Sequence, residues 1–355
     1  MGSFESMSRL SRSISWPARA AVLALGIGGA AATRGSALKP ALPSASSSVA
    51  DDSADAKRPL WMEMRNVRLH VDQSAAMRVA ELRGEAVPTK AGSVVILDDP
   101  NSFLVQVSSG RIALDGPALS ALMYEVVFAY KGAPVRDLKV SVVDGALVQS
   151  GILHKGVDLP FKMTASVTLM PDSRLRVHPT SMRMMGIDGE KLMHALGLHL
   201  KNFLDARGAR GLTVEGDDML LDPLQMMPPP TVRGRVAGVR LDSSTMVVEF
   251  ARTSADSIFG TLVRTDSGSV NYVHFRGGRL RFGRLEMRDT DLLINDADVT
   301  NWFDLYLEHY AEQLSAGYSR TMPNAALRVV MPDYRFVAAG GSVKPPPVPS
   351  VVGAR

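Results

Sequence analysis

The sequence predicts an α+β fold that is mostly β, in which a strongly curved antiparallel β-sheet is wrapped around one or more amphipathic helices. Short segments alternate apolar and polar side chains and end at Asp or Gly turns, a pattern typical of strands with one buried face. Three other stretches repeat apolar residues at helical spacing. With 355 residues and 46% hydrophobic content, the chain is long enough for a sizeable core. The ordered body is expected from about residue 60 to 338.

The body is expected to open with strands and a short helix. Val67, Leu69 and Val71 alternate with polar residues, as in a strand. Asp115 can cap the helix that follows, and Pro117 suits its first turn. The further strands expected before this helix are 93–98, 103–108 and 111–114. The apolar stripe of the helix consists of Leu119, Leu122, Met123, Val126 and Tyr130. We expect this helix to be almost completely buried.

The clearest hairpin surrounds Asp144 and Gly145, a pair that suits the two positive-φ positions of a tight turn. A long alternating strand follows, with its apolar face formed by Phe161, Met163, Ala165, Val167 and Leu169. A turn is expected at Gly277–Gly278, and Gly283 suggests a bulge in the next strand.

Two more helices are expected. One begins after Asp188 and is amphipathic, as in a helix that lies on a sheet. Its apolar face consists of Leu192, Met193, Leu196, Leu200, Phe203 and Leu204. The other is capped by Thr300 and has a stripe of Phe303, Tyr306, Leu307, Tyr310 and Leu314.

The chain divides into five predicted segments. They are a signal peptide at 1–32, a flexible linker at 33–58, an α+β domain at 59–228, a second β-rich segment ending in a helix at 229–338, and a disordered Pro-rich tail at 339–355. The run Pro228, Pro229 and Pro230 is equally compatible with a domain boundary and with a stiff crossing between the halves.

The amino terminus predicts export to the periplasm or cell envelope. Basic residues up to Arg19 precede the apolar run from Ala20 to Ala32, and cleavage is expected after Ala32. The alternative is an uncleaved anchor, although the run is shorter than the ~20 residues that span a bilayer. The chain contains no cysteine, which excludes disulfides, thiol nucleophiles, thiolate metal sites and a lipid-modified cysteine.

The sequence predicts no catalytic residues, no metal ligands and no cofactor. The mature region contains no phosphate-binding loop, nucleophile elbow or metalloprotease motif. A formal net charge of +4 is too small to indicate nucleic-acid binding. The arginines at 276, 279, 281, 284 and 288 fit the wet face of a strand, or contact with anionic headgroups at a membrane surface. The sequence leaves any protein partner unknown.

Methionine is unusually frequent, with 19 residues in the chain. Flexible thioether side chains fill irregular gaps in cores and also line pockets for varied apolar ligands. Those that cluster in the middle of the sequence are Met182, Met184, Met185, Met193, Met219, Met226 and Met227.

Residues 103 to 225 resemble the LmeA-like bacterial envelope proteins and, more distantly, the tubular lipid-binding (TULIP) superfamily. The likeness lies in the apolar helix at 119–127, the strands at 136–151 and 157–167, and the segment 172–187 leading into 190–198. The resemblance implies a curved antiparallel sheet around a helix, with an apolar groove for lipid acyl chains. It does not extend to the second half of the chain.

The sequence supports two main hypotheses and a third reading. The first is an exported protein that binds lipid or another apolar ligand between sheet and helix. The second is a non-catalytic structural or partner-binding envelope protein with a solid core, and an enzyme is the third reading. The candidate ligand-binding residues are Leu119, Leu122, Met123, Val126, Phe161, Met163, Ala165, Val167, Leu169 and Leu196.

Overall fold

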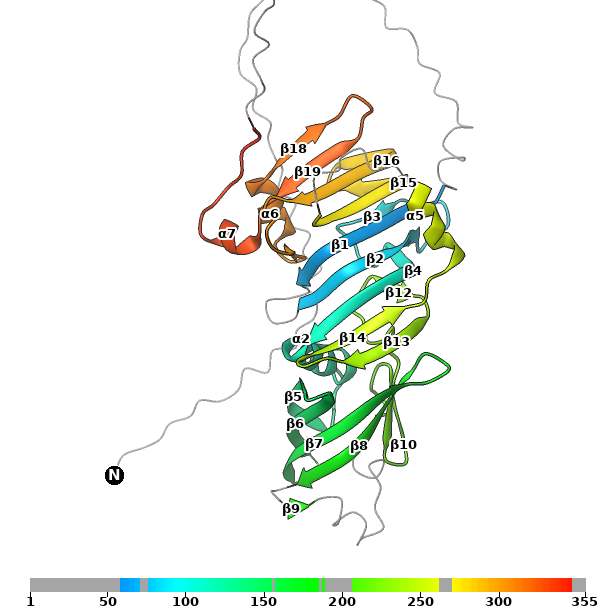
Figure 1. Ribbon diagram of the computed structural model, residues 1–355, viewed down its shortest axis with the longest axis vertical. Helices are drawn as coiled ribbons and strands as arrows, with labels where there is room; N and C mark the ends of the chain where they lie inside the picture. Colours follow the sequence, from blue (N-terminus) through cyan, green and yellow to red (C-terminus); the bar gives the residue numbers. More distant parts are fainter. Residues whose placement is uncertain are drawn as a thin grey trace, which may run out of the picture. The chain divides into compact units, whose positions relative to one another are not determined.

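The protein is described from a computed structural model, which covers residues 58–70, 76–154, 157–184, 187–188, 206–261 and 270–346. These residues form two large, mainly antiparallel sheets with a few short helices (Figure 1). The prediction of a mostly β fold with antiparallel sheets is therefore confirmed. Among the described strands, neither sheet closes or curls into a tube.

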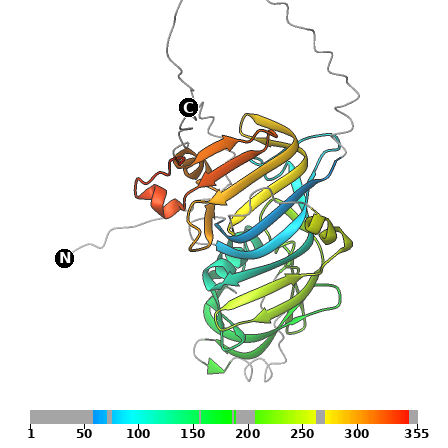
Figure 2. The same ribbon diagram turned by 45° about the horizontal axis from the view of Figure 1, so that its top comes forward.

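The larger sheet joins strands from distant parts of the chain. Its strands are β1 (Leu60–His70), β2 (Ala76–Pro88), β3 (Val95–Ile96), β4 (Phe103–Asp115), β12 (Thr231–Arg233), β13 (Val236–Leu241), β14 (Thr245–Phe250), β15 (Tyr272–Phe282), β16 (Leu285–Asp296), β17 (Phe303–Tyr306), β18 (Tyr318–Thr321) and β19 (Leu327–Met331). The order is β13-β14-β4-β2-β1-β15-β16-β19-β18, and β12, β17 and β3 pair with β4, β1 and β15. Figure 2 shows the blue β1 lying between strands from the first and second halves of the chain.

The smaller sheet comes from the middle of the chain. Its strands are β5 (Val135–Val143), β6 (Ala146–His154), β7 (Asp158–Leu169), β8 (Leu175–Met184), β9 (Ile187–Asp188), β10 (Leu212–Glu215) and β11 (Asp218–Leu221). The order is β10-β11-β8-β7-β6-β5, with β9 on β8. Asp144 and Gly145 join β5 to β6 with φ of 51° and 73°, so the predicted hairpin is confirmed.

The described helices are short. They are α2 (Gly116–Ala121), the π-helix η1 (Leu122–Val127), the 3₁₀ helix η2 (Ser254–Asp256), α5 (Ser257–Thr261), α6 (Tyr310–Ala316) and α7 (Tyr334–Ala338). The predicted cap of α2 is confirmed, because the Asp115 carboxylate accepts a 3.0 Å hydrogen bond from the Ala118 amide. In η1, which continues α2, Leu122, Met123 and Val127 are buried.

The predicted helix after Thr300 is wrong in its first half. Phe303 to Tyr306 form β17, which runs parallel to β1 with Phe303 beside Val67. This pairing gives the backbone N–H and C=O groups of residues 303–306 the hydrogen-bond partners that a helix would otherwise have provided. It also buries Phe303 completely. The helix begins only at Tyr310, as α6.

The predicted glycine turn and bulge are also wrong. Gly277 and Gly278 lie inside β15, where a side chain on Gly277 would come within 2.7 Å of the Pro59 carbonyl oxygen. Close backbone approach therefore requires glycine at this point. The turn falls at Gly283, since Phe282 pairs directly with Leu285.

Both predicted halves contribute to the larger sheet. Strands β1 to β4 come from the predicted 59–228 segment, and β12 to β19 come from the 229–338 segment. The buried apolar side chains of both sheets form one core cluster. The predicted signal peptide, nearly all of the linker, and the 189–205 part of the predicted second helix lie outside the described residues. No helix among the residues described is both long and apolar enough to cross a membrane.

Candidate functional site

The helical segment α2–η1 is held against β5 by a close backbone contact and a hydrogen bond. The Ser120 hydroxyl accepts a 2.8 Å hydrogen bond from the Val140 amide. A side chain on Gly116 would come within 2.9 Å of the Val140 carbonyl oxygen, so only glycine fits there. This anchoring places the apolar side chains of η1 over the buried face of the smaller sheet.

Two apolar cavities lie in this region, with volumes of about 40 Å³ and 30 Å³. The first is lined by Met123, Phe128, Val135, Leu138, Gln149, Leu153, Phe161, Met163, Met182, Met184 and Met219. The second is lined by Leu114, Leu119, Leu122, Met123, Val140, Leu147, Gln149, Val167, Leu175, Val177, Leu221, Pro223, Met226, Met227, Met246 and Val248. Met123 and Gln149 line both, so the cavities adjoin.

Methionine dominates the lining of the first cavity, where five of eleven side chains are methionines. Unbranched thioether chains change rotamer easily, which lets a cavity change its shape around an apolar guest. Both cavities are far smaller than the roughly 150 Å³ cavity that admits benzene. A larger guest therefore has to displace the methionine side chains.

Gln149 is the polar exception in this lining. The residue is 4% exposed, and its amide makes no hydrogen bond within the described part of the chain. Its backbone pairs with Val140 on β5 and Met163 on β7, which fixes the side chain on the buried face of β6. The sequence analysis missed this residue. The available signal was its position in the strand pattern. Gln149 lies two residues after the buried Leu147, on the same face of β6, where an apolar residue is expected.

The predicted ligand-binding residues are only partly brought together. Met123, Phe161 and Met163 line the first cavity. Leu119, Leu122, Met123 and Val167 line the second. Val126, Ala165 and Leu169 lie in or against the core but line neither cavity. Leu196 lies outside the described residues. Of the clustered methionines, Met182, Met184 and Met219 line the first cavity, and Met226 and Met227 line the second.

His178, Asp218 and Asp98 are engaged in contacts between strands and turns. His178 Nδ1 and Arg176 Nε lie 2.6 Å from opposite oxygens of Asp218. Asp98 accepts a hydrogen bond from the Gly283 amide at 2.6 Å and another from the Tyr310 hydroxyl. Burial and these interactions with Asp98 raise the pKa of Tyr310 well above its ordinary value. No group of three or more His, Asp or Glu in the described ranges is placed to hold a metal ion.

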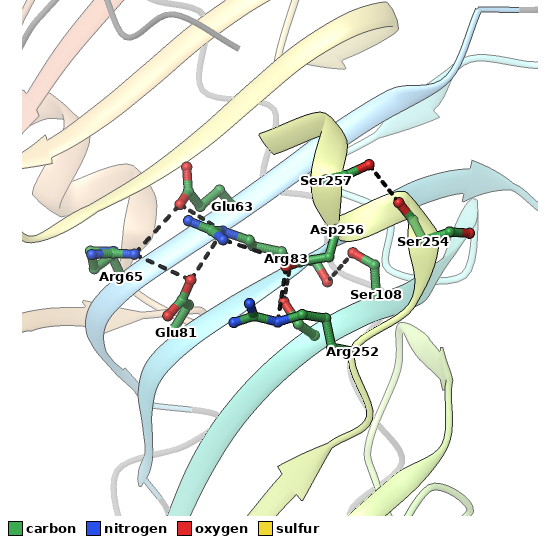
Figure 3. A network of polar contacts seen from close by, with 10 residues as sticks. Glu63, Arg65, Glu81, Arg83, Ser108, Arg252, Ser254, Asp256 and Ser257 are labelled. Carbon is green, nitrogen blue, oxygen red and sulfur yellow. Dashed lines mark hydrogen bonds and ion pairs between the residues drawn. The ribbon is translucent and has the colours of Figure 1, made fainter. Parts of the chain in front are cut away.

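A polar network on β1 and β2 holds the η2–α5 segment against the larger sheet (Figure 3). Arg83 Nε lies 3.0 Å from both Glu63 Oε1 and Glu81 Oε1. Its Nη1 lies 3.7 Å from Asp256, which also accepts a hydrogen bond from Ser109. The guanidinium stacks over the Phe259 ring at 5.5 Å. Through Arg83, these contacts connect the η2–α5 segment to β1 and β2.

Comparison with protein-family models, curated proteins and solved structures found no match to the chain. The function therefore has to be inferred from the residues themselves.

Proposed function

We propose that this is an exported, non-catalytic protein that binds lipid or another apolar ligand between the smaller sheet and the α2–η1 segment. The observation that supports the proposal is the pair of adjoining apolar cavities, lined by methionines and sharing Gln149. The proposal includes the arrangement expected from the sequence, in which a curved sheet is wrapped around helices. Contact of the β15 and β16 arginines with anionic headgroups is a further part of it.

The energetics of such binding are those of apolar burial. Each Å² of apolar surface that the ligand removes from water contributes about 25 cal/mol. Rotamer changes in Met163, Met182 and Met184 would enlarge the first cavity without moving the strands that carry them. An acyl chain is the ligand class that such a deformable and almost wholly apolar lining suits best.

The small cavity volumes favour a second candidate. At about 40 Å³ and 30 Å³, the cavities are also compatible with ordinary packing defects in a core that is otherwise filled. The protein would then be a structural or partner-binding protein of the envelope. Ligand extraction distinguishes the two candidates directly.

The first experiment is mass spectrometry of lipids extracted from protein that has been expressed in a bacterial host and purified without detergent. We expect acyl lipid in near-equimolar amount. Repeated recovery of protein without lipid, combined with failure to take up a fluorescent acyl chain from vesicles, would exclude the lipid-binding function.

A pair of variants on β5 then tests the location of the site. Val135→Phe places a larger side chain in the first cavity, so lipid uptake should fall at least tenfold with little change in melting temperature. Val142→Phe is the matched control, because Val142 is 4% exposed and lines neither cavity. There the same change overpacks the core and should cost about 1–3 kcal/mol. Equal uptake by Val135→Phe and the parent protein would place the ligand elsewhere.

A further inference from the structure

Gln149 occupies the junction of the two cavities. With Met123, it is one of two residues that line both, and ten of the eleven side chains around the first cavity are apolar. The residue is 4% exposed, and its amide has no hydrogen-bond partner among the described residues, so the amide faces the cavities. The side-chain amide carries two N–H donors and one carbonyl acceptor.

A buried amide without a partner is costly. In an almost wholly apolar cavity the amide keeps fewer hydrogen bonds than it has in water, whereas an apolar residue of the same shape would lose none. Such a group is therefore poorly explained by core packing alone, since leucine or methionine would fill the position better. Hydrogen bonding to a guest in the cavity removes the cost.

The lining also restricts the charge of the guest. No Asp, Glu, Lys, Arg or His is among the side chains that line either cavity in the described part of the chain. An ionised group held there would lose its hydration without gaining a counter-ion. The group that meets Gln149 must therefore be uncharged, and apolar surface lies on both sides of it.

We propose that Gln149 donates a hydrogen bond to an uncharged carbonyl group in the middle of the ligand, whose apolar arms occupy the two cavities. The ligand class is then a neutral acyl ester, in contrast to a free fatty acid with its ionised end or a pure hydrocarbon. This inference rests on the proposed function of the same cavities and adds the chemistry of the ligand.

The test compares two probes of equal chain length, hexyl hexanoate and tridecane. The full mature chain is loaded from cyclodextrin complexes, and bound probe is measured by mass spectrometry. One hydrogen bond predicts that the ratio of ester binding to tridecane binding is about fivefold higher in the parent protein than in Gln149→Met. Ester binding should therefore weaken in Gln149→Met while tridecane binding stays unchanged, and the melting temperature of the empty protein should rise. Ser150→Met is the matched control, because Ser150 is the next residue on β6 and lines neither cavity.

The outcomes separate this inference from the function on which it rests. An ester-to-tridecane ratio that is the same in the parent protein and in folded Gln149→Met would overturn the role of Gln149 and leave apolar-ligand binding intact. Failure of the parent protein to bind either probe would overturn both. Gln149→Leu provides the same comparison if Gln149→Met does not fold.

Discussion

Arg328 on β19 and Asp291 on β16 form a partly buried ion pair, with Arg328 Nη1 2.9 Å from Asp291 Oδ1. His274 on β15 contacts the same carboxylate, its Nε2 2.9 Å from Oδ1. Burial opposes ionisation of Asp291, but the hydrogen bonds from His274 and Arg328 outweigh it and hold its pKa well below the usual range. For His274, burial dominates over the bond to Asp291 and lowers the pKa. Three strands of the larger sheet are thus joined by one carboxylate.

Removing the cation of this pair should be strongly destabilising. Arg328→Met leaves a partly buried carboxylate without its guanidinium, which should cost about 3 kcal/mol in the free energy of urea unfolding. The double variant Arg328→Met/Asp291→Asn should recover part of the loss, because the unpaired charge is gone. A loss below 0.5 kcal/mol would show that the pair does not stabilise the sheet. Because the Asp291 pKa is depressed, the stability it contributes is present above about pH 4 and is lost as the pH falls further.

Asp296, at the end of β16, should have the opposite pH dependence. Burial, followed by the charges of Asp333 and Asp298, raises its pKa to about 7. The folded protein therefore binds a proton between about pH 4 and 7 that the unfolded chain has released, so this group lowers stability as the pH rises through that window. Asp296→Asn should stabilise the protein by about 1–2 kcal/mol at pH 8 and much less at pH 4.5. Unfolding curves at the two pH values provide the measurement, and an equal effect at both would contradict the assignment.

Ala165, at the centre of β7, should not tolerate a larger side chain. It is 0% exposed and lines neither cavity, although the sequence placed it among the ligand-binding residues. Ala165→Leu should therefore cost about 1–3 kcal/mol in thermal or urea unfolding, with lipid uptake at low temperature unchanged. Thr168→Leu, on the exposed face of the same strand, is the control and should change stability by less than about 0.5 kcal/mol. Unchanged stability in Ala165→Leu would reveal space at this point of the core.

The proposed export predicts a defined mature amino terminus. Cleavage after Ala32 makes Thr33 the first residue, which intact-mass measurement of protein from the periplasmic fraction checks directly. Recovery of the full-length chain in the membrane fraction would instead support the uncleaved anchor.

Local features were predictable where neighbouring residues determine them. Asp144 and Gly145 produce their hairpin because the two positions tolerate positive φ, and Asp115 caps α2 through an amide three residues away. The alternation in β7 identified a strand, because one buried face requires that period.

The errors arose where distant partners compete with local preference. Residues 303 to 306 have a helical apolar spacing, but β1 offers them backbone partners and they form β17. Gly277 and Gly278 look like a turn, but the approach of Pro59 and Leu60 and a positive φ at both positions explain glycine inside β15.

Local sequence was sufficient to predict the mostly β character, the α2 cap, the main hairpin and the apolar, methionine-rich nature of the central region. Each of these depends on local conformational preference or on the period of apolar side chains. Tertiary structure alone decided that strands from both halves share one sheet and that Gln149 meets Met123 at two adjoining cavities. Strand pairing and cavity volume depend on contacts between residues far apart in the chain, and periodicity along the chain carries no information about either.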